Sequence, residues 1–381
     1  MTLPDDRPAV AENTTATMTS RRDVMAGTTA GLVGATILGN QPAQALAGVP
    51  LRVPMPPPAP APRADLVNVF EYEDQARLAL GAAKMAPVAG SDRTVTDRIT
   101  LRPRMNIPTR ELDLTTSLFG DQHFTPIIVG PMADHKRFHP EGEIATARGA
   151  SAAKAAMVVS SDASMPLSAI AQGLTTPLWL QVYANSPKLK DRLAEASLAK
   201  AKAVIVTVNA GASANAPATP DSAHIDWAAV DAVVKNTHLP VIVKGITHPQ
   251  DAKVAVARGA RGVVVSNYRG GSAAALKGTL LLIAPVVQAV GGQVPVLVDG
   301  SFRYGADILK ALALGAKGVL IGRPILWGLA AYGADGVQGV VELLQTDLAR
   351  IMAMCGRLNL AAVNDSLVRI HAALPPVKHN G

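Results

Sequence analysis

Eight short apolar segments recur from residue 126 onward, and their number constrains the fold more than any other feature of the chain. They lie about 20–40 residues apart and consist mainly of Val, Ile, Leu and Ala. Continuous apolar runs of this length are typical of parallel strands that are buried on both faces. The segments are residues 126–130, 157–160, 178–183, 203–208, 240–245, 262–267, 295–300 and 318–323.

Stretches with helical periodicity alternate with these segments, as at residues 142–154, 189–201, 249–258 and 304–314. This alternation predicts a parallel sheet with helices outside it. A doubly wound open sheet usually has fewer strands and carries a Gly-rich turn after the first one, which this chain lacks. The count of eight therefore predicts an α/β fold, a (β/α)8 TIM barrel, with an N-terminal helical extension.

Residues 1–47 have the pattern of an export signal. A pair of arginines at 21–22 precedes a small-residue apolar stretch at 26–38, and a small-x-small triplet follows at 45–47. The apolar stretch is too short to span a hydrocarbon core of about 30 Å, so no stable membrane span is expected. The paired arginines resemble a twin-arginine signal, which implies a periplasmic location. A chance Arg-Arg pair beside an Ala-rich helix is the alternative.

A proline-rich linker is predicted at residues 48–64, because seven of the thirteen residues from 50 to 62 are proline. Proline at this density gives a stiff, extended chain. The folded barrel is then predicted to occupy residues 65–375.

The composition excludes several classes of function. Apolar residues make up 49% of the chain and charged residues 17%, which supports a large core. The single Cys355 excludes an intramolecular disulfide and a multi-thiolate metal site, and no histidine pair has metal-ligand spacing. Lys and Arg total 36 against 29 for Asp and Glu, without a long basic run. We therefore expect no metal and no nucleic-acid partner.

Candidate site residues follow the predicted strands, at the carboxyl ends where (β/α)8 barrels hold their active sites. A single serine or threonine there could be a cap or a solvated loop residue, but all eight ends carry polar or turn residues. These are Pro131, Met132, Ala133, Ser160, Ser161, Asp162, Gln181, Tyr183, Thr207, Asn209, Lys244, Ser266, Asn267, Tyr268, Arg269, Asp299, Gly300, Ser301, Gly322 and Arg323.

The last two strand ends are candidate phosphate sites. Gly300 and Gly322 offer backbone N–H groups, and Arg303 and Arg323 follow them closely. A structural ion pair is the alternative for each arginine. Lys244 ends an apolar strand, where an ammonium group needs an anionic partner. It could form a Schiff base, or it could stabilise negative charge on a bound cofactor.

Residues 66–370 resemble the FMN-dependent α-hydroxy-acid dehydrogenase/oxidase family, of the glycolate and lactate oxidase type. The matching motifs occur in order along the whole predicted barrel. They are LRPR at 101–104, HPEGE at 139–143, ATAR at 145–148, LQVY at 180–183, VKG at 243–245, VSN at 265–267, KALALGA at 310–316 and IGRP at 321–324.

The resemblance implies a bound FMN and a homo-oligomer, a tetramer. Lys244 would face flavin N1 and O2, where the reduced ring carries negative charge. The other contacts that it implies are the backbone of Pro131, Met132 and Ala133 near N5, then Ser160 or Ser161, Gln181 and Thr207 on the polar edge of the ring, Ser266 on the ribityl chain, Asp299, Gly300 and Arg303 on ribityl and phosphate, and Gly322 with Arg323 on phosphate.

The chain departs from the family where the family binds and deprotonates its substrate. Tyr268 stands in place of the family's catalytic histidine, and Asn209 replaces the aspartate that orients it. The position of the arginine that binds the substrate carboxylate is Gly271, with Arg269 two residues earlier. A second such arginine and an N-terminal substrate tyrosine are also absent, whereas Tyr183 is retained. Because a phenol ordinarily ionises only near about pH 10, it is a poor base at neutral pH.

Other predicted pocket positions are polar here. Asp134 and His135 follow the first strand, and Asp162 stands where the family usually has a bulky apolar residue. Carboxylates at these positions would suit a cationic or amine-bearing substrate, or one could act as a base. The alternative for Asp134 and His135 is a structural network within their own loop.

These observations predict an FMN-dependent oxidoreductase with an altered substrate. It would oxidise a C–H bond next to OH or NH of a small molecule and pass the electrons to O2, a quinone or a carrier protein. Tyr268, Lys244, Tyr183, Asp162 and Arg269 are its candidate catalytic residues. The alternatives are a catalytically silent flavin-binding relative that acts as a binding protein, and non-redox, isomerase-type chemistry assisted by the flavin.

Overall fold

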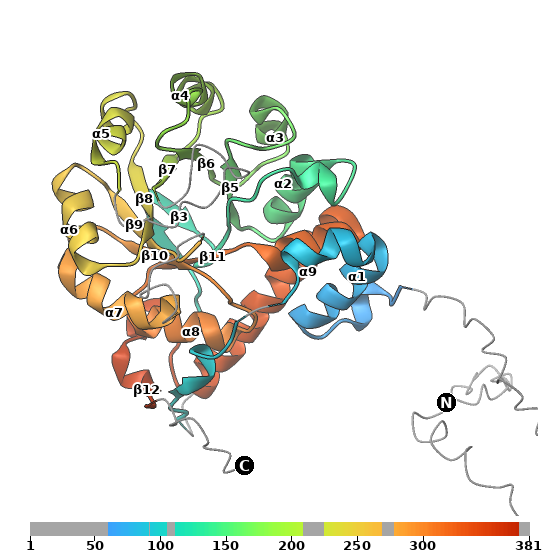
Figure 1. Ribbon diagram of the computed structural model, residues 1–381. Helices are drawn as coiled ribbons and strands as arrows, with labels where there is room; N and C mark the ends of the chain where they lie inside the picture. Colours follow the sequence, from blue (N-terminus) through green and yellow to red (C-terminus); the bar gives the residue numbers. More distant parts are fainter. Residues whose placement is uncertain (1–59, 91, 105–110, 209–224, 269–277, 373–381) are drawn as a thin grey trace, which may run out of the picture. The chain divides into compact units, whose positions relative to one another are not determined.

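Eight parallel strands form a closed barrel in the computed structural model, which describes residues 60–90, 92–104, 111–208, 225–268 and 278–372 (Figure 1). The strands follow one another around the barrel in chain order, and the last pairs with the first. This confirms the predicted (β/α)8 fold. The strands are β4 (Ile127–Val129), β5 (Ala156–Ser160), β6 (Leu178–Tyr183), β7 (Ala203–Thr207), β8 (Val241–Ile246), β9 (Gly262–Val265), β10 (Val296–Asp299) and β11 (Gly318–Ile321).

Helices surround the barrel and cover the outer face of its strands (Figure 1). The four helices predicted from periodicity correspond to α2, α4, α6 and α8, with ends shifted by at most a few residues. The surrounding helices are α2 (Gly142–Ala152), α3 (Leu167–Gln172), α4 (Leu189–Leu198), α5 (Trp227–Lys235), α6 (Pro249–Ala257), α7 (Thr279–Val290), α8 (Gly305–Ala313) and α9 (Arg323–Met354).

The barrel interior is filled by side chains and closed at its amino end by a hairpin. The hairpin consists of β2 (Thr116–Leu118) and β3 (Asp121–His123). Between them, Phe119 packs edge-on against Trp179, with ring centroids 5.3 Å apart. A Cβ on Gly262, the first residue of β9, would lie 2.8 Å from the Phe119 ring. The hairpin therefore blocks the amino ends of the strands and leaves the carboxyl ends for a site.

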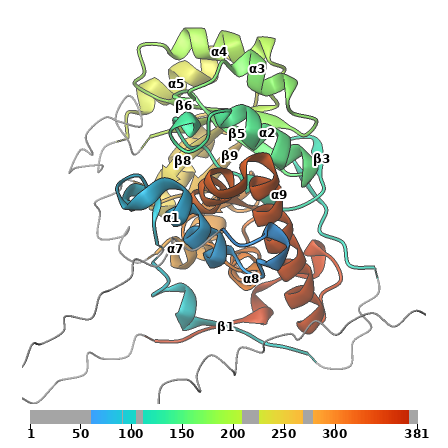
Figure 2. The ribbon, with the colours of Figure 1, turned by 90° about the vertical axis from the view of Figure 1, so that its right-hand side faces the viewer.

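An N-terminal helical extension precedes the barrel, as predicted. It contains the short 3-10 turns η2 (Arg63–Asp65) and η3 (Ala86–Val88) on either side of α1 (Val69–Met85). The Asn68 side chain accepts hydrogen bonds from the backbone at Phe70 and Glu71, which starts the helix. Helix α1 packs against α9 (Figure 2). This contact carries the residues after α1 to the edge of the barrel.

Helix α9 is kinked, and its two halves approach each other closely. Gly333 has a φ of 60°, so the chain bends there. A Cβ on Gly328 would clash with the carbonyl oxygen of Gly336, and only glycine allows that approach. The kink was not predicted, because it depends on a contact between two glycines eight positions apart.

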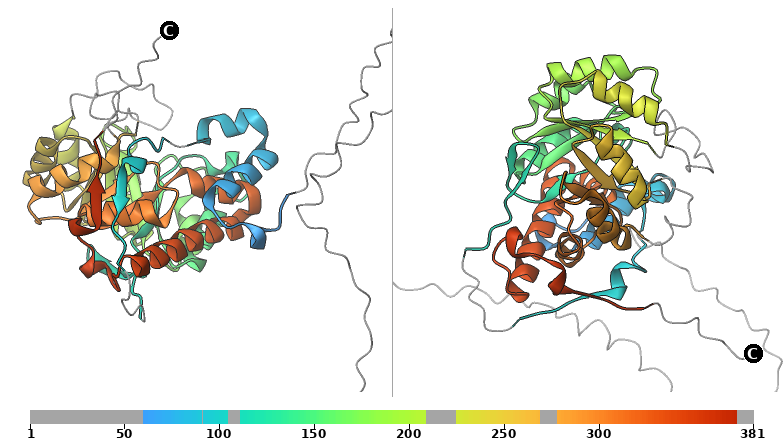
Figure 3. Two further views of the ribbon diagram at one scale, coloured as in Figure 1. Left: turned by 90° about the horizontal axis from the view of Figure 1, so that it is seen from below. Right: turned by 90° about the vertical axis from the view of Figure 1, so that its left-hand side faces the viewer.

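The remaining elements are short. Strand β1 (Ile99–Leu101) pairs antiparallel with β12 (Val368–Ile370) (Figure 3). Single 3-10 turns complete the described chain: η4 (Thr96–Arg98), η5 (His135–Arg137), η7 (Leu360–Ala362) and η8 (Asp365–Leu367). Within the described ranges, no helix combines the length and the apolar character that crossing a membrane requires. The predicted signal segment and most of the predicted linker lie outside the described residues.

Candidate active site

A cavity of about 560 Å³ opens at the carboxyl ends of the barrel strands. This volume falls within the range of about 300–1,000 Å³ that is usual for small-molecule sites. The wall is completed by Pro87 and Val88 of the N-terminal extension. Most of the predicted site residues line it together: Pro131, Met132, Ala133, Ser160, Gln181, Tyr183, Thr207, Lys244, Tyr268, Asp299, Gly300, Arg303, Gly322 and Arg323.

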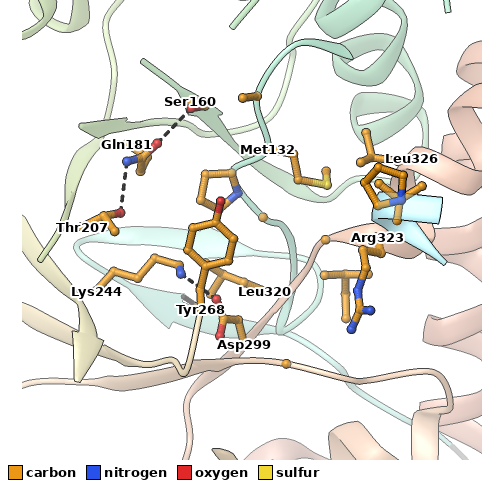
Figure 4. A pocket seen from close by; sticks show the side chains of 18 of the residues that line it. Met132, Ser160, Gln181, Thr207, Lys244, Tyr268, Asp299, Leu320, Arg323 and Leu326 are labelled. Atoms are coloured by element: carbon orange, nitrogen blue, oxygen red, sulfur yellow. Dashed lines mark hydrogen bonds and ion pairs between the residues drawn. The ribbon is translucent and has the colours of Figure 1, made fainter. Parts of the chain in front are cut away.

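Three buried polar side chains form a hydrogen-bonded row across neighbouring strands (Figure 4). The Ser160 hydroxyl donates to Gln181 Oε1 over 3.0 Å, and Gln181 Nε2 donates to the Thr207 hydroxyl over 3.0 Å. Ser160 and Thr207 are the last residues of β5 and β7, on either side of β6. The row therefore presents amide and hydroxyl groups to the cavity, and they suit the polar edge of a heterocycle.

Lys244 is held in the wall by an ion pair. Its Nζ lies 2.7 Å from Asp299 Oδ2 and donates to the Ser266 hydroxyl over 2.9 Å. Ser266 in turn donates to Asp299 over 3.0 Å. Asp299 thus supplies the anionic partner that the buried ammonium group of Lys244 requires. The pairing leaves Lys244 on the cavity surface, and Ser266 supports it from behind without lining the cavity.

Two arginines, Arg303 and Arg323, line another part of the wall without an ion-paired partner among the described residues. Arg303 is buried, whereas Arg323 is half-buried. Arg303 donates to the carbonyl oxygens of Phe302 and Gly90, each over 2.9 Å, and its Nε has no hydrogen-bond partner within the described ranges. Arg323 donates to the Ala89 carbonyl over 3.2 Å. Burial and, after it, the charge of Arg323 lower the pKa of Arg303 to about 9, and burial also lowers the pKa of Arg323.

The hydrogen bonds of the Arg303 guanidinium go to backbone carbonyl groups, and no carboxylate of the described chain forms an ion pair with it. The nearby Asp307 carboxylate pairs with Arg93 at 2.7 Å, and from Arg303 it accepts the backbone N–H rather than the guanidinium. Gly322, at the N-terminus of α9, has no side-chain cap on the first N–H groups of the helix. Two guanidinium groups and a helix N-terminus form a donor set that fits a phosphate. The site therefore fits the phosphate of FMN.

The extension orients these arginines through three consecutive carbonyl groups, a segment that we call the 88–90 strap. Val88 accepts from Trp327 Nε1 over 2.9 Å, Ala89 accepts from Arg323, and Gly90 accepts from Arg303. Glu73 of α1 anchors the strap by accepting the Gly90 N–H over 2.7 Å. This role was not predictable from the sequence, because no local pattern shows which backbone carbonyls contact a residue more than 200 positions away.

Only some of the candidate catalytic residues line the cavity. Tyr268 lies in the wall with 43% of its surface exposed, and Lys244 Nζ lies 5.2 Å from its ring centroid (Figure 4). Tyr183 is buried and also lines the cavity. Asp162 and Ser161 follow β5 but do not line the cavity. Arg269 and Asn209 lie outside the described residues, as does Gly271.

The turn after β4 separates the two polar residues that the sequence placed there. His135 is buried in a structural network, where its Nδ1 lies 2.8 Å from the Thr146 hydroxyl and its backbone N–H donates to Glu143 over 3.0 Å. Burial lowers the pKa of His135, although the Glu143 carboxylate opposes that shift. Asp134 instead lines the cavity. Arg137, which sequence analysis did not select, lines it too.

No group of three histidine, cysteine, aspartate or glutamate side chains in the described part of the chain is arranged to hold a metal ion. The main polar groups of the cavity are the Ser160–Gln181–Thr207 row, the Lys244–Asp299 ion pair and the two arginines.

Comparison with known proteins identifies the family. A family model described as FMN-dependent dehydrogenase matches residues 79–219 and 209–370. A peroxisomal (S)-2-hydroxyacid oxidase of Arabidopsis thaliana is 34% identical over 340 residues, which cover 76% of this chain and 93% of the relative. An L-lactate oxidase of Nostoc sp. is 33% identical, with 80% and 98% covered.

A solved structure shows the same fold. Mandelate oxidase with (S)-2-phenylpropionate aligns with a TM-score of 0.72 and 32% identity, over 81% of this chain and 100% of that chain. The sequence match and the fold agree with the donor groups of the cavity. The chain belongs to the FMN-dependent dehydrogenase family, and FMN is its cofactor.

Proposed function

We propose that this protein oxidises a small organic molecule at a C–H bond next to oxygen or nitrogen, and that simple 2-hydroxy acids are poor substrates for it. The observation that carries this proposal is the position of Tyr268. It lies in the cavity wall beside Lys244, and the family motif that it interrupts carries a histidine as base at this position. A phenol keeps its proton at neutral pH, so it does not replace that histidine as a base.

The loss of the family's carboxylate-binding arginine supports the same proposal. Its motif position is Gly271, which has no side chain to bind an anion. An arginine–carboxylate pair is both strong and directional, so its loss removes affinity and orientation together. A chain that lacks the base and this clamp is expected to favour a different substrate from its relatives.

The remaining cavity residues include the groups that are needed to bind a flavin and to stabilise its charge. FMN supplies the two-electron acceptor for the oxidation. Lys244 places a positive charge on the cavity surface, where it would stabilise negative charge on a bound flavin ring. The row of Ser160, Gln181 and Thr207 would hold the ring by its polar edge. Arg303 and Arg323 would hold the phosphate.

The electron acceptor and the location belong to the same proposal. The relatives that are named oxidases favour O2 as acceptor, and a quinone or a carrier protein is the alternative for an exported enzyme. The arginine pair at residues 21–22 supports export to the periplasm through a twin-arginine signal. The family resemblance supports a homotetramer.

A donor screen tests the proposed function. The purified protein, saturated with FMN, is assayed with an artificial electron acceptor against 2-hydroxy acids, primary alcohols, amines and amino acids. The proposal predicts turnover with at least one alcohol, amine or amino acid at a kcat/KM well above that for glycolate or L-lactate. A marked preference for glycolate or L-lactate contradicts it. Complete inactivity in the presence of bound FMN favours a catalytically silent binding protein.

A further inference from the structure

Two charged residues that line the cavity are not among the groups assigned above to FMN. Lys244 pairs with Asp299, and Arg303 and Arg323 form the phosphate site. The other charged side chains that line the described part of the cavity are Asp134 and Arg137. Neither makes a hydrogen bond or an ion pair through its side chain within the described residues. In that part of the chain, one acidic and one basic group, both solvent-exposed, thus stand at the cavity without a side-chain hydrogen bond or ion pair.

Asp134 and Arg137 lie one turn apart on a well-anchored backbone. The Arg137 N–H donates to the Asp134 carbonyl over 3.1 Å, and the Asp134 N–H donates to the Asp162 carbonyl over 3.2 Å. Between the two residues, His135 is fixed to Thr146 and Glu143 in the core. The Lys136 N–H donates to the Ser164 hydroxyl over 3.0 Å. The turn therefore fixes the backbone from which both exposed side chains extend, which lowers the part of the binding cost that comes from ordering that backbone.

The backbone of Asp134 is itself unusual. Its φ of 53° lies in the left-handed region, which aspartate and asparagine tolerate better than most residues. Non-glycine residues in this region are often found at functional sites, where the surrounding structure holds them. At a backbone position that glycine would adopt more easily, this chain thus has a carboxylate at the cavity edge.

The cavity next to this turn also has an apolar part. Met132 and Phe138 flank Asp134 and Arg137 in sequence, and Tyr183 and Tyr268 line the same cavity. Thioether and aromatic groups are suited to an apolar or aromatic side chain of a ligand.

We propose that the substrate is zwitterionic, an α-amino acid whose ammonium group contacts Asp134 and whose carboxylate contacts Arg137. This inference rests on the proposed function, because it names the substrate class for the same cavity. A ligand that covers both residues but carries only one charge leaves the other residue unpaired and partly desolvated, which is unfavourable. A zwitterion satisfies both, and the arginine can bind its carboxylate through two parallel hydrogen bonds.

Isothermal titration of the FMN-loaded protein under anaerobic conditions tests this inference without relying on turnover. Three ligands share one side chain: L-phenylalanine carries both charges, L-phenyllactate only the carboxylate, and phenethylamine only the ammonium group. L-Phenylalanine is expected to bind at least about ten-fold more tightly than either of the others. Binding of L-phenyllactate that equals or exceeds that of L-phenylalanine, or no binding of L-phenylalanine, overturns the inference.

Two variants separate the roles of the charges. The Arg137→Met variant should bind L-phenylalanine no more tightly than phenethylamine. It should still bind L-phenylalanine more tightly than L-phenyllactate. Asp134→Asn, which tolerates the same backbone conformation, should do the reverse. Lys136→Met is the matched control, because Lys136 lies between the two residues but does not line the cavity. Equal weakening of all three ligands by either variant, with native-like thermal unfolding, contradicts the assigned roles.

The inference and the proposed function can fail separately. If L-phenylalanine is preferred but no donor is oxidised in the screen, the proposed function fails and the zwitterion site stands. If an alcohol or a simple amine is oxidised but the ligand preference is absent, the zwitterion site fails and the proposed function stands.

Discussion

Arg303 donates a hydrogen bond of 2.9 Å to the carbonyl oxygen of Gly90, a residue 213 positions earlier in the chain. This bond joins the last part of the barrel to the extension that precedes it. Because Ala89 and Val88 accept from Arg323 and Trp327 in the same way, the extension orients both of the arginines that we expect to bind phosphate. Binding of FMN is therefore expected to depend on residues outside the barrel.

Removal of the Arg303 guanidinium should weaken FMN binding selectively. A hydrogen bond to a charged group contributes about 1.5–3 kcal/mol, so Arg303→Met should reduce FMN affinity about 10–100-fold. Affinity for riboflavin, which lacks the phosphate, should change little. Fluorescence titration of the apoprotein measures both. Arg258→Met, which removes an exposed arginine paired with Asp231, is the control. Equal losses for FMN and riboflavin would place Arg303 elsewhere than at the phosphate.

FMN affinity should also depend on pH. Burial and the charge of Arg323 lower the pKa of Arg303 to about 9 in the protein without a bound anion. Below that pH the guanidinium is charged and binds phosphate, and above it the charge is progressively lost. The ratio of FMN to riboflavin affinity should therefore be constant from about pH 7 to 8 and fall above about pH 9. A ratio that stays flat to about pH 10.5 would contradict this account.

The lowered pKa of Arg303 also makes the free energy of unfolding depend on pH. The folded pKa of Arg303 lies below its ordinary value, so the unfolded chain binds more protons between the folded and the ordinary pKa. The cost of burying the charge is thus fully present below about pH 9 and is relieved as the pH rises above it. Chemical unfolding of the apoprotein should show that Arg303→Met is more stable than the unaltered protein near neutral pH. Its advantage should shrink above about pH 9.

Glu73 should act as a positioning residue for the 88–90 strap. Glu73→Ala leaves the Gly90 N–H without its acceptor, which is expected to cost about 1–3 kcal/mol of unfolding free energy and to speed the release of FMN. Glu73→Gln keeps an acceptor oxygen and should restore slow release. Stopped-flow measurement of FMN release, together with urea unfolding, distinguishes the two variants. If the glutamine variant releases FMN as fast as the alanine variant, the anchoring role assigned to this oxygen is wrong.

Restoring the family's base should not restore the family's activity. Tyr268→His combined with Asn209→Asp supplies the base and its orienting carboxylate but not the family's carboxylate-binding arginine, whose motif position is Gly271. We expect the kcat/KM for L-lactate to rise by less than about ten-fold, a gain of under about 1.4 kcal/mol in transition-state stabilisation. Adding Gly271→Arg should increase it further. A thousand-fold gain from the first two changes alone would show that another cavity residue, such as Arg137, already orients the carboxylate for the reaction.

The sequence predicted the barrel well because its strands are buried on both faces. Burial requires continuous apolar runs, and these end where the polar residues begin, so Gln181, Thr207 and Lys244 could be placed at the carboxyl ends from the pattern alone. Arg303 and Arg323 were likewise placed at the cavity from the sequence, because each closely follows a glycine at the end of a strand, and their phosphate role stays a prediction. Features that local periodicity determines were therefore predictable.

Contacts between distant segments were not predictable in this way. The carbonyl group of Gly90 carries no sequence signal for its contact with Arg303. Phe119, which closes the amino end of the barrel against Trp179, is an ordinary aromatic residue in a short segment. Asp134 and His135 are adjacent and were considered together, yet the turn directs one to the cavity and the other into the core. Such differences depend on the packing of the turn.

We expect this protein to bind FMN but to react poorly with simple 2-hydroxy acids. The visible spectrum of the purified protein before and after anaerobic addition of L-lactate or glycolate tests this expectation. The flavin absorption bands should persist after either addition. Prompt bleaching of those bands would contradict it, because it would show that Tyr268 and the missing arginine leave hydroxy-acid oxidation intact.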